Sequence, residues 1–137
     1  MPKVKKKKEN YSKKKRPFEE EFIWHLALGL WMLGIFVLSG IEGSGQNYYD
    51  LRMLIERKGA HIFEFFVLAY LFWKVLSFYS LEFRKRAWLT FLLSLLFASW
   101  DEVHQLFVFG REGKIVDVGI DLVGILIFII ALGFRKK

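Results

Sequence analysis

The stretch FIWHLALGLWMLGIFVLSGI, residues 22–41, decides the class of fold. His25 is its one ionisable side chain, and a helix of about 20 apolar residues crosses a bilayer core of about 30 Å. One alternative is a buried helix of a soluble protein. The other is a cleavable signal peptide, which is disfavoured because the basic leader and the apolar run are both long and no small-x-small cleavage site follows. We predict a retained transmembrane helix.

Three further apolar stretches follow, from about residue 59 to 81, from 87 to about 109, and from 115 to 134. Four such stretches in succession, joined by short connections, argue against buried helices of a soluble domain. The composition agrees, because 54% of the 137 residues are hydrophobic and 18% are aromatic, well above an ordinary soluble domain. The sequence therefore predicts an all-α, polytopic membrane protein with four transmembrane helices.

The net charge of +7 comes from the N-terminal tail. Residues 3–16 hold nine Lys or Arg side chains and one acid, which leaves 12 basic and 13 acidic residues for the rest of the chain. We predict residues 1–20 to be a disordered, cytoplasmic tail that contacts anionic lipid heads, and residues 21–137 to be the membrane domain. Nucleic-acid binding is not expected, because the tail has few aromatic residues and leads directly into an apolar stretch. The absence of cysteine excludes disulfides and thiolate metal sites.

The Lys/Arg distribution predicts the orientation. The tail, the loop with Arg84–Arg86 and the C-terminal Arg135–Lys137 are basic, and four crossings would put all three on one side. Both termini are therefore expected in the cytoplasm. The loop of residues 42–57 and the turn GREGK, residues 110–114, are expected to face outward.

Three carboxylates are expected at one depth in the outer half of the bilayer. A rise of 1.5 Å per residue puts Glu64 and Asp121 about 9 Å below the outer edge of the core, and Asp101 about 9 Å short of it. A charged side chain at the centre of a bilayer costs about 2.5–3.5 kcal/mol. These groups should therefore face the bundle interior or a wet cavity that opens outward.

Helical periodicity places the neighbouring polar residues on the same faces as these carboxylates. The alternative to a functional site is an ion-pair network that only holds the helices together. The expected cationic partners of the acids are Lys58, His61, His104 and Arg111. The three faces comprise Lys58, His61 and Glu64, then Asp101, Glu102 and Gln105, and finally Asp117, Asp121 and Gly124, the last allowing a neighbouring helix or a ligand to approach closely.

Two segments, RKGAHIFEFFVLAY at residues 57–70 and DEVHQLFVFGREGKIVDVGIDLVG at residues 101–124, resemble the VanZ-like family of small bacterial membrane proteins. The resemblance covers roughly residues 22–133. Phe109 stands where the family often has proline, and Asp121 where it often has Asn. The founding member is associated with low-level teicoplanin resistance, so the resemblance implies a link to glycopeptide tolerance. The pattern of the family matches this chain at Lys58, His61, Glu64, Asp101, Glu102, Gln105, Gly110, Arg111, Asp117, Asp121 and Gly124.

We expect a site that binds or processes an envelope component bearing a phosphate or a sugar, such as a membrane lipid or lipid-linked precursor. The carboxylate oxygens and an imidazole of this site could also hold a divalent cation. A proton-coupled permease, which would need a homodimer, and a non-enzymatic scaffold are the alternatives. Whether the protein is an enzyme stays open. Catalytic roles are assigned to His61, Glu64, Asp101, Glu102, Gln105 and Asp117, and substrate binding to Lys58, Arg111, Asp121 and Gly124.

Overall fold

The fold was derived from a computed structural model, which describes residues 17–41, 51–109 and 114–134. These ranges hold four α-helices and no strand, so the all-α prediction is confirmed for them. The helices are α1 (Phe18–Ser39), α2 (Leu51–Leu76), α3 (Phe83–Gln105) and α4 (Ile115–Phe134). Residues 1–16 of the predicted tail and residues 110–113 of the GREGK turn lie outside the described residues, whereas residues 18–20, which were expected in the tail, belong to α1.

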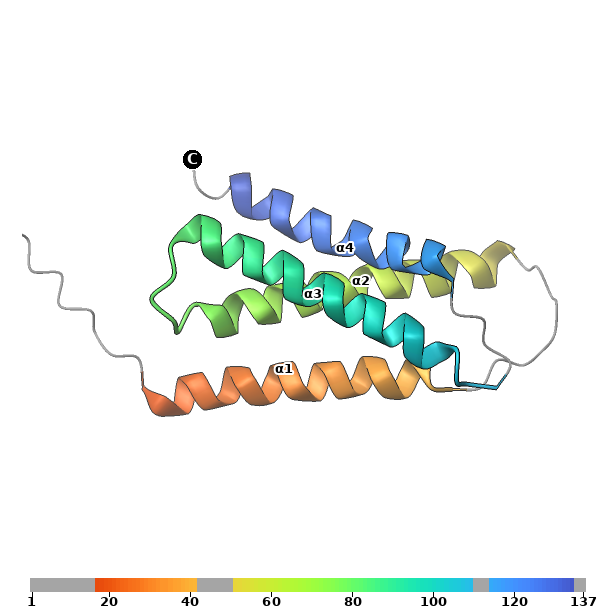
Figure 1. The fold of residues 1–137 in the computed structure, drawn as a ribbon, viewed down its shortest axis with the longest axis horizontal. Coiled ribbons are helices and arrows are strands. Elements are labelled where there is room, and N and C mark those ends of the chain that lie inside the picture. The colour runs from red at the N-terminus through yellow and green to blue at the C-terminus, as the bar shows by residue number, and fades with distance from the viewer. Residues whose placement is uncertain (1–16, 42–50, 110–113, 135–137) are drawn as a thin grey trace, which may run out of the picture.

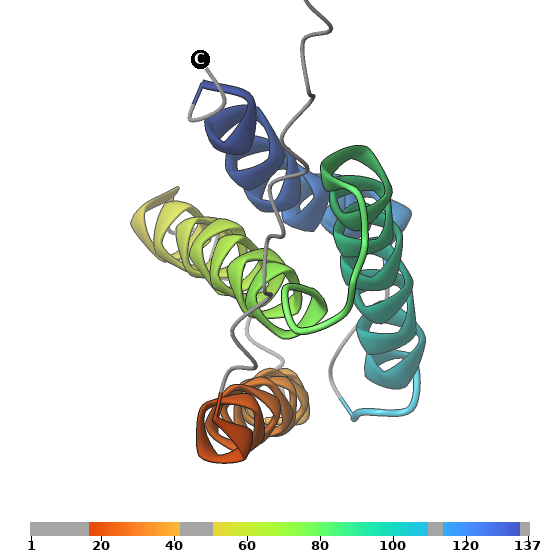
Figure 2. The same ribbon diagram turned by 90° about the vertical axis from the view of Figure 1, so that its left-hand side faces the viewer.

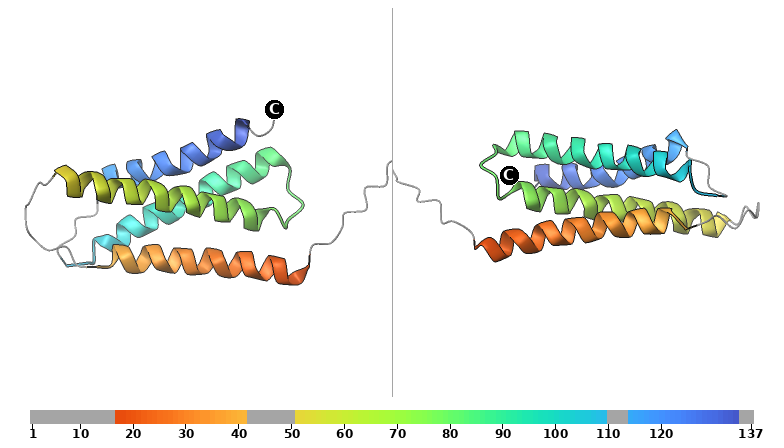
Figure 3. Two further views of the ribbon diagram at one scale, coloured as in Figure 1. Left: turned by 180° about the vertical axis from the view of Figure 1, so that it is seen from behind. Right: turned by 60° about the horizontal axis from the view of Figure 1, so that its bottom comes forward.

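Consecutive helices run in opposite directions, and α2 contacts each of the other three (Figure 1). Viewed end-on, α2, α3 and α4 form a three-helix group, and α1 lies beside α2 at its edge (Figure 2). The views from behind and below show the same arrangement (Figure 3). The C-terminal ends of α1 and α3 therefore lie at the same end of the bundle as the N-terminal ends of α2 and α4.

Helices α2 and α4 approach each other closely at Gly124. A Cβ atom added to Gly124 would lie 2.1 Å from the backbone oxygen of Ile62. Only a residue without a side chain lets the two backbones come this close. The core beside this contact is apolar, with Phe65, Leu68 and Ile125 fully buried. The close approach that was predicted at Gly124 is therefore made by helix α2, and this contact fixes α4 against α2.

Large apolar side chains cover much of the outside of the bundle, among them Leu30, Trp88 and Ile130, each more than half exposed. By length and composition, α1, residues 57–76 of α2, and α4 could each cross a membrane. Helix α3 does not meet the same criterion. Arg84–Arg86 at its start and Asp101 and Glu102 near its end leave a shorter uninterrupted apolar stretch.

Two helices end at least four residues earlier than the apolar stretches predicted. Helix α2 ends at Leu76 rather than near Leu81, and α3 ends at Gln105 rather than near Phe109. After each end, three successive N–H groups donate to carbonyls three residues back, beginning with Ser77 to Lys74 and with Leu106 to Val103. These tight turns use the carbonyls that a helix end leaves free. Apolar residues therefore continue past both helix ends.

At the end of the bundle away from the predicted site, basic side chains lie on aromatic rings. Lys74 Nζ is 4.9 Å from the centre of the Trp24 ring, and Arg86 Cζ is 3.4 Å from that of Trp73. Such cation–π contacts attach a charge to amphipathic rings. Trp and Tyr at one end of an apolar bundle are typical of a membrane–water boundary.

Candidate functional site

Asp101 connects α1 to α3 at the other end of the bundle. One carboxylate oxygen accepts a hydrogen bond from Ser39 Oγ at 2.5 Å, and the other accepts one from Gln105 Nε2 at 3.1 Å. Only 1% of the Asp101 surface is exposed. Gln105 lies one turn after Asp101 on α3, which is the spacing at which helical side chains meet. Both oxygens of this buried carboxylate are thus hydrogen-bonded, but to neutral groups.

His61 and Asp121 form a second pair, between α2 and α4. His61 Nδ1 lies 3.1 Å from Asp121 Oδ1 and donates to it in the tautomer that carries the proton on Nδ1. Asp121 is buried to the same degree as Asp101, and its second oxygen has no hydrogen-bond partner among the described residues. A carboxylate on Nδ1 fixes the ring orientation and leaves Nε2 as the nitrogen for another contact.

Two further contacts hold the start of α4. Glu102 Oε1 accepts a hydrogen bond from the backbone N–H of Lys114 at 2.5 Å, and Lys58 Nζ lies 3.4 Å from Asp117 Oδ1. Glu102 is buried, whereas Lys58 and Asp117 are more than one-third exposed. Both contacts position α4 against its neighbours.

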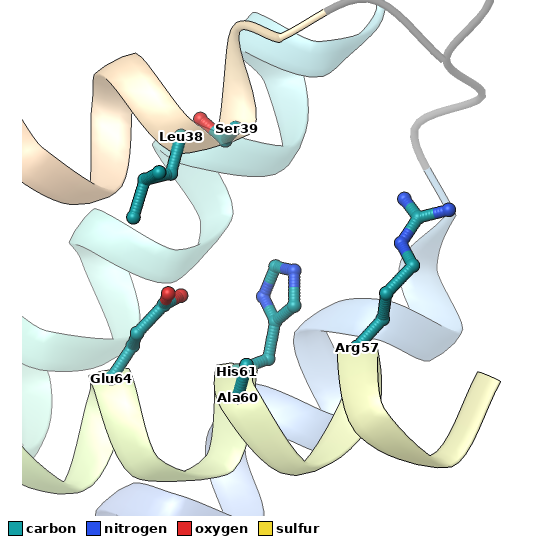
Figure 4. Close-up of a pocket in the computed structure, with 6 residues that line it drawn as sticks. All are labelled: Leu38, Ser39, Arg57, Ala60, His61 and Glu64. Carbon is teal, nitrogen blue, oxygen red and sulfur yellow. The ribbon is translucent and has the colours of Figure 1, made fainter. Parts of the chain in front are cut away.

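A pocket of about 150 Å³, partly open to the surface, lies between the end of α1 and the beginning of α2. Arg57, His61 and Glu64 follow one another along α2, and their side chains all extend toward the end of α1 (Figure 4). Residues spaced by four and by seven share one face of a helix, so this arrangement follows from their positions in the sequence. Among the described residues, the lining is Leu38, Ser39, Arg57, Ala60, His61 and Glu64.

Glu64 is held in place through its backbone, since Trp31 Nε1 donates to its carbonyl oxygen at 3.1 Å. Its carboxylate has no hydrogen bond to another described residue and extends into the pocket (Figure 4). The carboxylate is close enough to Asp101, Asp121 and His61 for electrostatic interaction. Glu64 therefore remains available to a ligand.

The inner part of this site holds more acids than bases. Glu64, Asp101 and Asp121 lie near a single imidazole, His61. Uncompensated charges are expensive in an apolar surrounding, so a cationic group or protons would stabilise the arrangement. Within the described ranges, no three His, Asp or Glu side chains are grouped closely enough to hold a metal ion. A hard cation such as Ca²⁺ takes six to eight oxygen ligands.

The structure brings together most of the residues that the sequence singled out. Asp101 meets Gln105, His61 meets Asp121, Lys58 meets Asp117, and Glu64 lines the pocket. Their catalytic and binding roles stay predictions. Lys58 is directed to α4 and is absent from the lining of the pocket, although it shares a helix face with His61 and Glu64.

Other expected contacts differ. His104 stacks on Phe36, with ring centres 3.9 Å apart, and makes no ion pair with a described acid. Glu102 bonds to a backbone N–H. Gly110 and Arg111 lie outside the described residues. Among the cations named from the sequence, only His61 and Lys58 are therefore seen beside carboxylates.

The sequence analysis did not identify Ser39 and Arg57 as members of the site. Ser39 ends the first apolar stretch, and a single Ser in such a stretch is a weak signal because its hydroxyl can bond to the helix itself. Arg57 could have been found, since it lies four residues before His61 and seven before Glu64. It was grouped instead with the outward loop, because the apolar stretch was expected to begin near residue 59.

Comparison with known proteins gives one result at the level of a family. The family model VanZ/LLP1 matches residues 15–135. No curated protein and no solved structure matches the chain significantly. The matched range contains all four helices and every residue of the pocket.

Proposed function

The chain belongs to the VanZ/LLP1 family, and from this premise we propose that it binds the polar head of an envelope component bearing a phosphate or a sugar. The pocket between α1 and α2 is the binding site, and it faces the outside of a bacterial cell membrane. The link to teicoplanin tolerance is part of this proposal.

The observation that carries the proposal is the placement of charge around the pocket. Arg57 and Glu64 line it, and the buried acids Asp101 and Asp121 lie near its inner end. A cluster that only joined helices would be expected to satisfy its own charges, whereas Glu64 has no hydrogen-bonded partner among the described side chains. A polar ligand would supply the missing contacts.

Four membrane spans are part of the proposal, and the surface of α3 supports the fourth. Its polar residues Thr90, Ser94 and Asp101 are buried, although polar side chains usually face water on a soluble helix. Four large apolar side chains, spaced by four, are exposed on the helix: Trp88, Leu92, Leu96 and Trp100. This inside-out pattern is expected for a helix surrounded by lipid.

The orientation follows from the basic residues. Arg84 and Lys85 lie at the start of α3, at the opposite end of the bundle from the pocket. The excess of Lys and Arg favours the cytoplasmic side for that end. The pocket then opens at the outer leaflet, where the heads of lipids and lipid-linked precursors lie.

If the site processes its ligand, His61 is the residue best placed for proton transfer. Asp121 holds Nδ1, so Nε2 can accept or donate a proton at a ligand oxygen. Arg57 suits an anionic group, because its planar guanidinium donates two parallel hydrogen bonds to a phosphate. Lys58, which pairs with Asp117 on α4, and Arg111, which lies outside the described residues, keep their proposed role of adding positive charge for the ligand.

The test replaces pocket residues in cells that depend on the protein. We expect His61→Ala and Asp121→Asn to change both teicoplanin susceptibility and the profile of envelope lipids, while Lys85→Gln, at the other end of the bundle, changes neither. Protein amount and thermal unfolding are measured for each variant. Unchanged susceptibility and lipid profiles in cells with folded variant protein would overturn the proposal. Changes that appear only when the variant fails to fold would indicate a scaffold.

A further inference from the structure

We infer that the head bound in this pocket carries both a primary amine and a phosphate, with the amine at Glu64 and the phosphate at Arg57. The inference rests on the proposed function and narrows its ligand to one chemical class. Ethanolamine phosphate is the simplest member of that class.

The amine is inferred from the hydrogen bonds of the three acids. Asp101 is hydrogen-bonded to neutral groups, Asp121 is paired with the imidazole of His61, and Glu64 has no hydrogen-bonded partner within the described ranges. A sugar hydroxyl would supply hydrogen bonds but no charge. An ammonium group supplies a positive charge and three donors, and it brings no acceptor that would face the carboxylates.

A primary amine fits the lining better than a quaternary one. Quaternary ammonium groups have no N–H and are bound by cages of aromatic rings. Among the described residues of the lining, the only ring is the imidazole of His61, and the other members are Leu38, Ser39, Arg57, Ala60 and Glu64. A metal ion is a poorer fit than an ammonium group, because no three potential ligands are grouped in the described part of the chain.

The phosphate is inferred from Arg57 and the spacing along α2. Arg57 and Glu64 are seven residues apart, about 10 Å along the helix axis, and both line the pocket, with the His61 side chain between them (Figure 4). A ligand between the two side chains therefore meets an anion-binding fork at one end and a carboxylate at the other. At about 150 Å³ the pocket is smaller than the 300–1,000 Å³ typical of drug-sized ligands, which favours a compact head.

The experiment compares three lipids that share a phosphate and differ in the group attached to it, which is a primary amine, a quaternary ammonium group or an uncharged glycerol. The full chain is purified in detergent, and bound lipid is counted by native mass spectrometry with phosphatidylethanolamine, phosphatidylcholine or phosphatidylglycerol. We expect phosphatidylethanolamine to bind about tenfold more tightly than the other two, as one hydrogen bond to a charged group would give. Free phosphoethanolamine is titrated separately by thermal shift. If free phosphoethanolamine stabilises the protein at the concentrations at which the lipid saturates its site, the soluble head group is sufficient for binding.

Three variants and one control assign the preference to the pocket. Glu64→Gln should remove the advantage of phosphatidylethanolamine and leave its binding equal to that of phosphatidylcholine, whereas Arg57→Gln should weaken all three lipids alike. Ala60→Leu, which fills the pocket without changing charge, should reduce binding even if Glu64→Gln fails to fold. Lys85→Gln should behave as wild type.

Equal binding of the three lipids by the wild-type chain would overturn the inference, and so would a preference that survives Glu64→Gln. The cellular test of His61 and Asp121 is independent of this result. If those variants still alter the envelope, the ligand class is wrong and the proposed function stands. If they do not, both fail.

Discussion

At the scale of the residue, Asp101 has the largest expected effect on stability. Asp101→Ala removes the acceptor of Ser39 and that of Gln105, and each bond to a charged group contributes about 1.5–3 kcal/mol. We expect the free energy of unfolding in detergent to fall by about 3 kcal/mol or more. Asp101→Asn should cost less, because it keeps the shape and one oxygen, and Gln105 can rotate its amide to present an acceptor. Equal losses for both variants would show that the hydrogen bonds are not the cause.

The Lys58–Asp117 pair should contribute far less. Both side chains are more than one-third exposed and their atoms are 3.4 Å apart, and exposed pairs are worth about 0.2–1 kcal/mol. A double-mutant cycle with Lys58→Gln and Asp117→Asn should therefore give a coupling energy below about 1 kcal/mol, which added salt reduces. A coupling well above that value would indicate that the pair is shielded from water.

The sequence could predict that these charged residues lie at a similar level along the bundle, but only part of their pairing. Asp101 and Gln105 are neighbours by helical spacing alone, so their contact needed no knowledge of the fold. The His61–Asp121 pair joins two helices, and a shared depth does not determine which acid meets the imidazole. Ser39 was missed because nothing in its own helix marks it, and only the packing of α1 beside α3 brings it to Asp101.

At the scale of the element, Gly124 determines how closely α4 approaches α2. Gly124→Ala places a Cβ against the backbone of Ile62, which cannot move aside as a flexible side chain could. Overpacking of this kind costs about 1–3 kcal/mol, and we expect a lower thermal midpoint together with weaker ligand binding. Gly119→Ala is the matched control on the same helix, since nothing lies within 4 Å of its Cβ position. An equal loss at Gly119 would assign the effect to the helix itself.

The existence and order of the helices were predictable, and three of the four had boundaries that differed from their apolar stretches. Hydropathy reports the part of a helix that suits lipid, whereas the hydrogen-bonded helix begins and ends for local reasons. Helix α2 starts at Leu51, eight residues before the predicted stretch, and thereby turns Arg57 into a helical residue that faces the pocket. Helix α4 matched its predicted stretch at both ends, because that stretch already included the acids Asp117 and Asp121 of the helix.

At the scale of the whole molecule, α3 decides between three spans and four. It lacks the apolar length of the other helices, yet it lies between the two ends of the bundle and buries its polar face. A helix lying on the membrane surface would put its two ends on the same side. A spanning helix separates them, and only then does the pocket face away from the basic residues at the start of α3.

The chain has no cysteine, so single introduced cysteines can report this topology. With four spans, a cysteine at Ser80, before α3, should react with a membrane-impermeant maleimide only after the cells are permeabilised. A cysteine at Phe109, after α3, should react in intact cells. Both sites lie outside the helices, and Phe109 is 84% exposed, so access is limited by the membrane rather than by the fold. Equal labelling of the two positions in intact cells would leave α3 on one side of the membrane. It would also remove the argument that the Arg57–Glu64 pocket opens at the outer leaflet.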